Sequence, residues 1–130
     1  MRNGKPVSEK LVLVVDDDSS VRESLSSLLA AGGYSVMEAE NGLDAFAELK
    51  GAPHFPCVIL LDLAMPVMDG RRFLELRAAD PMLRRIPVVV ISGNLPSGEP
   101  LDGIDSYLRK PVDVDHLMRI INSASTLSME

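Results

Sequence analysis

Three short runs of apolar residues place the strongest limit on how this chain folds. They are Leu11–Val15, Cys57–Leu61 and Ile86–Ile91, and only Pro87 interrupts the last one. Each run is continuous instead of alternating with polar residues, which is typical of strands covered on both faces in a parallel sheet. The stretches between them carry apolar residues at helical spacing. This alternation predicts an α/β fold with right-handed crossovers.

Weaker signals complete the expected order of elements. Two further strands are expected over Ser35–Glu38 and Ser106–Arg109. Glycines 32 and 33 suit the end of the first helix. The four helices are expected to begin at residues that suit a helix start: Ser20, in a capping-box pattern with Glu23, then Asn41, Gly70 and Asp113.

The segment 93–105 departs from this alternation. It holds four helix breakers, which are Pro96, Gly98, Pro100 and Gly103. We therefore expect the fourth helix to be shortened or missing. The alternation as a whole is typical of a doubly wound, five-stranded parallel sheet, for which we expect the flavodoxin-like order 2-1-3-4-5. The length of 130 residues suits a single domain, 1–130, with a core over about residues 10–126.

Composition excludes several classes of function. The net charge of −6 argues against nucleic acid as a partner, because a phosphate-binding surface needs clustered basic residues. The single cysteine, Cys57, excludes an internal disulfide and a multi-cysteine zinc site. No apolar stretch approaches the ~20 residues that cross a bilayer, and the first ten residues lack a signal-peptide core. A cytoplasmic domain without membrane insertion is expected.

Acidic residues follow two of the apolar runs. Asp16, Asp17 and Asp18 come after the first strand, and Asp62 comes after the third. In the order 2-1-3-4-5 these strands are neighbours, and their carboxyl ends meet where such sheets bind ligands. Carboxylates crowded together repel one another unless a cation joins them, and hard oxygen ligands suit Mg²⁺ or Mn²⁺. One of the three consecutive aspartates is also expected to cap the first helix.

The other two strand ends carry a hydroxyl and an amine. Ser92 ends the fourth strand, and Lys110 follows the fifth. A metal, a carboxylate, a hydroxyl and an ammonium together favour phosphoryl transfer, since cation and lysine offset charge on the phosphoryl oxygens. Asp62 is then the nucleophile, and an aspartyl phosphate is the product.

These residues resemble the receiver domain of bacterial two-component response regulators, the family that includes chemotaxis regulators. The resemblance covers residues 10–126 and rests on five motifs: Val14–Asp18, Asn41–Gly42, Leu61–Gly70, Ile91–Gly93 and Tyr107–Pro111. It implies that Asp16 and Asp17 hold Mg²⁺ together with Asp62 and the backbone carbonyl of Ala64. It also implies that Ser92 and Tyr107 are the switch residues, and that Lys110 pairs with the phosphoryl oxygens.

The resemblance further implies partners. A sensor histidine kinase or a histidine phosphotransfer protein would donate the phosphoryl group, and an unknown downstream protein would read the result. Such a module is not an enzyme beyond catalysing its own phosphorylation and dephosphorylation. The chain ends at Glu130, which leaves no room for an output domain if it is complete. The altered segment 93–105 argues against the common dimer through helix 4, strand 5 and helix 5, and homodimer formation stays open.

Alternative functions are weighed against this interpretation. The chain is either a stand-alone regulator or a receiver module of a hybrid kinase or multidomain regulator. A pseudo-receiver that binds partners without phosphorylation would usually lack a key acid or the lysine. A haloacid dehalogenase-type phosphatase needs a general acid where Ala64 stands, and a flavin carrier would not place Asp16–Asp18 at its phosphate loop.

Overall fold

A five-stranded parallel sheet forms the centre of the computed structural model, which describes residues 6–63, 70–93, 104 and 106–128. Its strand order is β2-β1-β3-β4-β5, as the sequence predicts. The strands are β1 (Val7–Val15), β2 (Ser35–Ala39), β3 (Phe55–Leu61), β4 (Val88–Ser92) and β5 (Ser106–Arg109). The helices are α1 (Ser19–Ala31), α2 (Gly42–Gly51), α3 (Gly70–Ala78) and α4 (Val114–Ser128), with a 3₁₀ turn η1 (Leu83–Arg85).

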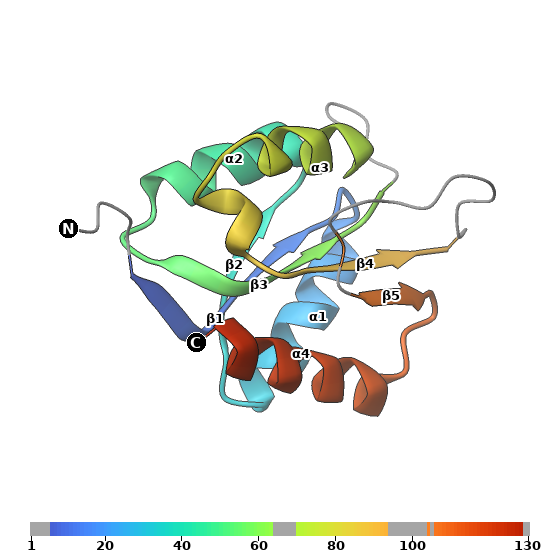
Figure 1. Cartoon of the computed structure of the whole chain (residues 1–130). Helices are drawn as coiled ribbons and strands as arrows, with labels where there is room; N and C mark the ends of the chain where they lie inside the picture. Colours follow the sequence, from blue (N-terminus) through green and yellow to red (C-terminus); the bar gives the residue numbers. More distant parts are fainter. Residues whose placement is uncertain (1–5, 64–69, 94–103, 105, 129–130) are drawn as a thin grey trace.

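Helices cover both faces of this sheet (Figure 1), with α2 and α3 on one side and α1 and α4 on the other. Alternate residues of each apolar strand enter the two cores. In β1, Leu13 and Val15 pack toward α2 and α3, whereas Val12 and Val14 pack toward α1 and α4. All seven residues of β3 are buried. The continuous apolar runs are therefore explained by a sheet that is covered on both sides.

Local signals placed the helix ends with one exception. The Asn41 side chain caps α2 by accepting a hydrogen bond from the Asp44 amide at 2.8 Å, and Gly33 adopts a left-handed φ of 94° after α1. The capping-box prediction at Ser20 is wrong: Asp18 is the N-cap of α1, and its carboxylate accepts from the amides of Ser20 and Val21. The cap lies two residues before Ser20, which confirms the expectation that one of the three consecutive aspartates caps the first helix.

The structure extends the predicted strands without changing their order. β1 begins at Val7, four residues before its apolar run, because Val7 pairs with Phe55 of β3 before the level at which β2 begins. The predicted shortened or missing fourth helix falls on residues 94–103 and 105, which lie outside the described residues. No helix in the described part of the chain is long and apolar enough to cross a membrane.

Candidate phosphoryl-acceptor and metal site

Asp16 and Asp62 lie side by side at the carboxyl ends of neighbouring strands. Asp16 follows β1, and its amide donates to the Ala39 carbonyl of β2 at 3.1 Å. Asp62 follows β3, and its amide donates to the Val15 carbonyl of β1 at 2.9 Å. The sheet hydrogen bonding therefore continues one residue past each strand and sets the positions of both acids.

Three carboxylates converge at this edge. Oxygen atoms of Asp16, Asp17 and Asp62 lie within 4.8 Å of one another. Asp16 is 2% exposed and Asp62 is 7% exposed, whereas Asp17 is exposed. Buried carboxylates this close repel one another strongly, so the arrangement is consistent with a hard divalent cation such as Mg²⁺. The predicted grouping of these three residues is confirmed by the geometry.

Lys110 supplies positive charge to the same cluster. Its Nζ lies 3.1 Å from Asp16 Oδ2 and 3.7 Å from Asp62 Oδ2. Burial, the largest single influence, lowers the pKa of Lys110. The hydrogen bond to Asp16 and the charges of Asp16 and Asp62 together outweigh it and raise that pKa above its ordinary value. The ammonium is therefore charged at neutral pH and partly balances the two buried acids.

Ser92 lies at the same end of the sheet. It is the last residue of β4, is 5% exposed, and its carbonyl accepts from the Lys110 amide at 3.0 Å. Because β4 pairs with β3 and β5, Ser92 stands between the strand ends that carry Asp62 and Lys110. The four predicted strand-end groups thus share one edge, while Ala64 lies outside the described residues.

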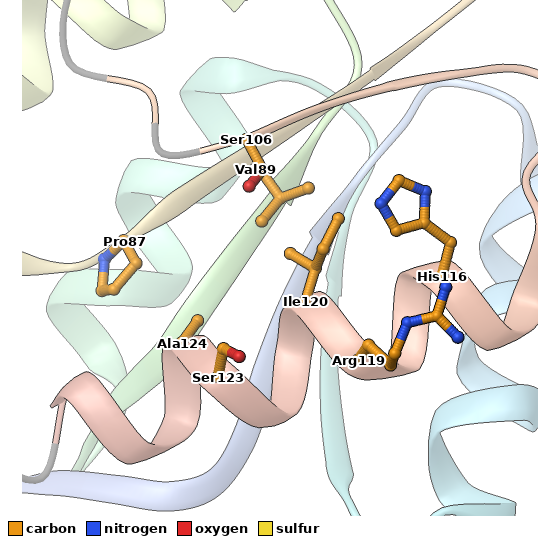
Figure 2. A pocket seen from close by; sticks show the side chains of 8 residues that line it. All are labelled: Pro87, Val89, Ser106, His116, Arg119, Ile120, Ser123 and Ala124. Atoms are coloured by element: carbon orange, nitrogen blue, oxygen red, sulfur yellow. The ribbon is translucent and has the colours of Figure 1, made fainter.

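One pocket of the described residues lies away from the acidic cluster. A pocket of about 430 Å³ opens between α4 and the starts of β4 and β5 (Figure 2). Pro87, Val89, Ile120 and Ala124 supply its apolar lining, and none of the predicted site residues reaches it. An ion and a phosphoryl group need no deep apolar cavity, so this pocket does not compete with the acidic cluster as the reactive site.

Comparison with known proteins decides the family. Residues 12–122 match the family model described as the response regulator receiver domain. This chain belongs to that family. The match favours the receiver interpretation over the phosphatase and flavin-carrier alternatives, and receivers are modules of two-component signalling instead of conventional enzymes.

Relatives of this receiver differ in length. It is 32% identical over 124 residues to the response regulator Rre1 of Synechocystis sp., covering 92% of this chain and 52% of Rre1. It is 30% identical over 116 residues to Protein PilH of Pseudomonas aeruginosa, covering 86% of this chain and 94% of PilH. The receiver thus spans about half the length of Rre1 and nearly all of PilH.

Solved structures share its fold. A CheY-like receiver domain protein from Methanospirillum hungatei superposes with a TM-score of 0.80 at 26% identity, over 94% of this chain and 98% of that one. The receiver domain of sensor histidine kinase PA1611 from Pseudomonas aeruginosa superposes with a TM-score of 0.81 at 24% identity, over 92% and 99%. That structure holds a magnesium ion in its active site cleft.

Tyr107 of the receiver lies in the middle of β5 and packs against the core on the α2 and α3 side. Its hydroxyl is buried and has no hydrogen-bond partner in residues 6–63, 70–93, 104 and 106–128. Burial raises the pKa of Tyr107 and outweighs the opposite effect of the Arg71 and Arg109 charges. A buried hydroxyl without a partner lowers stability, because it has lost its hydrogen bonds to water.

Replacing Tyr107 with phenylalanine is therefore expected to raise the free energy of unfolding by about 1 kcal/mol at pH 7. Because burial raises its folded-state pKa, the Tyr107 phenol ionises at lower pH in the unfolded chain than in the folded protein. The parent therefore loses stability as pH rises from 10, the ordinary tyrosine value, through the folded-state pKa. The advantage of Tyr107→Phe over the parent should therefore widen above pH 10. Urea unfolding at pH 7 and at pH values above 10 measures both effects.

Tyr34→Phe is the matched control for this measurement. The Tyr34 hydroxyl donates to Asn122 Oδ1, so its removal should lower the free energy of unfolding by about 1 kcal/mol. A loss of stability in Tyr107→Phe that equals the loss in Tyr34→Phe would mean that the Tyr107 hydroxyl is hydrogen-bonded in solution.

Gly70 holds the start of α3 against the loop that carries Asp62. Its amide donates to the Leu63 carbonyl at 2.8 Å. A Cβ atom at this position would lie 2.7 Å from Leu63 Cα and 2.8 Å from the Asp62 carbonyl oxygen. Both contacts are to backbone atoms. Asp62 and Leu63 can therefore lie this close to the start of α3 only because Gly70 has no side chain.

Gly70→Ala is expected to lower the free energy of unfolding by about 2 kcal/mol, because the backbone at Asp62 must shift to admit the methyl group. Urea unfolding provides the measurement. In Gly51→Ala, a Cβ has no atom within 4 Å, so that helical variant should keep or slightly gain stability. Equal stability of Gly70→Ala and the parent would contradict this close contact.

The sequence analysis did not predict the structural roles of two arginines, Arg77 and Arg22. Arg77 is 4% exposed, and its Nη2 donates to the backbone carbonyls of Arg84 and Ile86. Arg22 donates from Nη1 to the Asp16 carbonyl at 2.7 Å. Helical spacing offered a signal for Arg77, which lies four residues after the core residue Phe73, but nothing in the sequence identifies its carbonyl partners.

Proposed function

We propose that this receiver accepts a phosphoryl group on Asp62 in a Mg²⁺-dependent reaction and thereby controls protein contacts. We base the proposal on the meeting of Asp16, Asp17 and Asp62 with the Lys110 ammonium at one edge of the sheet. The magnesium ion in the PA1611 receiver, a protein of the same fold, supports the choice of cation. That protein is part of a sensor histidine kinase, which supports a histidine kinase or histidine phosphotransfer protein as donor.

The residues divide the reaction between them. Asp16, Asp17 and Asp62 would hold the cation, with the Ala64 carbonyl as a further expected ligand. When bound, the cation offsets negative charge on the phosphoryl oxygens. An Asp62 carboxylate oxygen attacks phosphorus while the phosphorus–nitrogen bond of the donor phosphohistidine breaks. The electron pair of that bond leaves with the imidazole, which then takes a proton, and Asp62 becomes an acyl phosphate.

Lys110 and the switch residues act after the transfer. The Lys110 ammonium already lies within 4 Å of Asp16 and Asp62, so a short movement brings it to a phosphoryl oxygen. Ser92 can donate its hydroxyl hydrogen to another phosphoryl oxygen, drawing the end of β4 toward Asp62. Tyr107, whose backbone pairs with Val90 two residues before Ser92, would then adjust its packing. An altered β4–β5 surface is what a downstream protein would read.

Intact-mass spectrometry after incubation with acetyl phosphate tests the proposal. The purified chain should gain the mass of one phosphoryl group in the presence of Mg²⁺. It should gain none when a chelator removes the cation. An adduct that forms equally well without a divalent cation would contradict the role of the acidic cluster.

A further inference from the structure

Arg22, on the first turn of α1, reaches back to the loop that carries two of the three acids. Its Nη1 donates to the Asp16 carbonyl at 2.7 Å, and its Nε lies 3.3 Å from Glu38 Oε1. The Arg22 side chain is 17% exposed. The guanidinium therefore uses two edges of its rigid plane at once, which a lysine cannot do.

Groups from two elements hold the guanidinium in place. Glu38 lies in β2, opposite Val14 of β1, so its backbone is part of the sheet. Its second carboxylate oxygen, Oε2, accepts from the Ser26 hydroxyl of α1 at 3.0 Å. Arg22, Ser26 and Glu38 thus form a connected network between α1, β2 and the loop after β1.

The carbonyl that Arg22 contacts belongs to the peptide that joins Asp16 to Asp17. A peptide is planar, so fixing its oxygen restricts the rotation that sets the direction of the Asp17 side chain relative to Asp16. The other Asp16 groups are also held: its amide bonds Ala39, and its Oδ1 accepts from the Asp18 amide at 2.9 Å. Arg22 is the contact that completes this arrangement on the Asp17 side.

We propose that Arg22 is a positioning residue for the divalent cation, setting the angle between the Asp16 and Asp17 carboxylates while touching neither. The inference rests on the proposed metal-dependent function. The direction of the change in cation affinity on removing Arg22 tests this inference, because a guanidinium acting only as a nearby positive charge would repel a dication. Removing it would then tighten cation binding, whereas removing a positioning residue weakens cation binding.

The experiment measures the dissociation constant for Mn²⁺ by electron paramagnetic resonance, with Mg²⁺ as competitor. Arg22→Met keeps most of the aliphatic stem and removes the guanidinium. Arg22→Lys keeps the charge and loses the planar fork. Both are expected to raise the dissociation constant about tenfold, as outer contacts to metal ligands commonly do. At saturating Mg²⁺ the acetyl phosphate reaction of both variants should approach the rate of the parent.

Two further variants separate positioning from charge and from folding. Arg72→Met removes an equal charge from the exposed Arg72–Glu75 pair, whose atoms lie 3.0 Å apart, and should leave the dissociation constant unchanged. Glu38 contacts Arg22 and none of the three clustered acids in the contacts described above, so Glu38→Gln should weaken cation binding by a smaller factor than Arg22→Met. Urea unfolding without metal confirms that each variant is folded. If Arg22→Met does not fold, Arg22→Lys still separates the two accounts, because it keeps the positive charge: a charge effect alone predicts an unchanged dissociation constant, and a positioning role predicts a higher one.

The outcomes distinguish the two proposals. A parent that binds neither cation overturns the metal-dependent function and this inference with it. A parent that binds Mn²⁺, with Arg22→Met and Arg22→Lys binding as tightly or more tightly, overturns the positioning role alone. Weaker binding in both arginine variants, with Arg72→Met unchanged, supports it.

Discussion

Replacing Asp62 with asparagine is expected to abolish the phosphoryl adduct that the receiver forms with acetyl phosphate and Mg²⁺. Asparagine has nearly the same shape, so it fills the buried position, which is 7% exposed in the parent. Its neutral amide is not a nucleophile at phosphorus under these conditions, whereas the carboxylate is. Intact-mass spectrometry should show no adduct in Asp62→Asn under conditions where the parent is fully modified.

Asp18→Asn provides a closely matched control. It removes the same charge two residues from Asp16, and asparagine keeps the oxygen that caps α1. Because Asp18 caps the helix and is not one of the three clustered acids, this variant should still acquire the adduct. An adduct that persists in Asp62→Asn would place the acceptor on another residue, and peptide mapping would identify it.

Replacing Lys110 with methionine is expected to slow phosphorylation by acetyl phosphate about a hundredfold. Removing one preformed donor to a developing negative charge typically has an effect of this size. Cation binding should be retained or tightened, because Nζ at 3.1 Å from Asp16 no longer competes for the carboxylate oxygens. Mass spectrometry of samples quenched at successive times measures the phosphorylation rate, and titration with Mn²⁺ measures the affinity for the cation.

The stability of Lys110→Met gives an independent readout. Without Lys110, the buried acids Asp16 and Asp62 lose their cationic partner, so the metal-free protein should unfold at lower urea concentration than the parent. Saturating Mg²⁺ should restore much of this loss. Lys50→Met, at the exposed end of α2, should change neither the rate nor the response to Mg²⁺. An unchanged phosphorylation rate in Lys110→Met would limit Lys110 to charge balance in the resting protein.

Much of this fold follows from local patterns. The run Cys57–Leu61 predicted a doubly covered strand because a residue buried on either face must be apolar, and β3 is indeed buried throughout. Asn41 and Asp113 predicted helix starts because their side chains satisfy free amides of the first turn, as they do for Asp44 and His116. The choice between Ser20 and Asp18 as cap could not be made this way, since both residues suit the position.

The sequence by itself determined the alternation of strands and helices. With the known flavodoxin-like strand order, it also determined the meeting of Asp16, Asp17 and Asp62, because parallel strands bring their carboxyl ends to one edge. Only the tertiary structure decided which ion pairs and hydrogen bonds form at that edge. Lys110 lies closer to Asp16 than to Asp62 although 94 residues separate the pair, and Arg22 finds Glu38 across 16 residues. Such contacts depend on how helices pack on the sheet and on which rotamers that packing allows, and no local pattern encodes them. The same holds for Tyr107, whose place in β5 was predictable but whose buried hydroxyl was not.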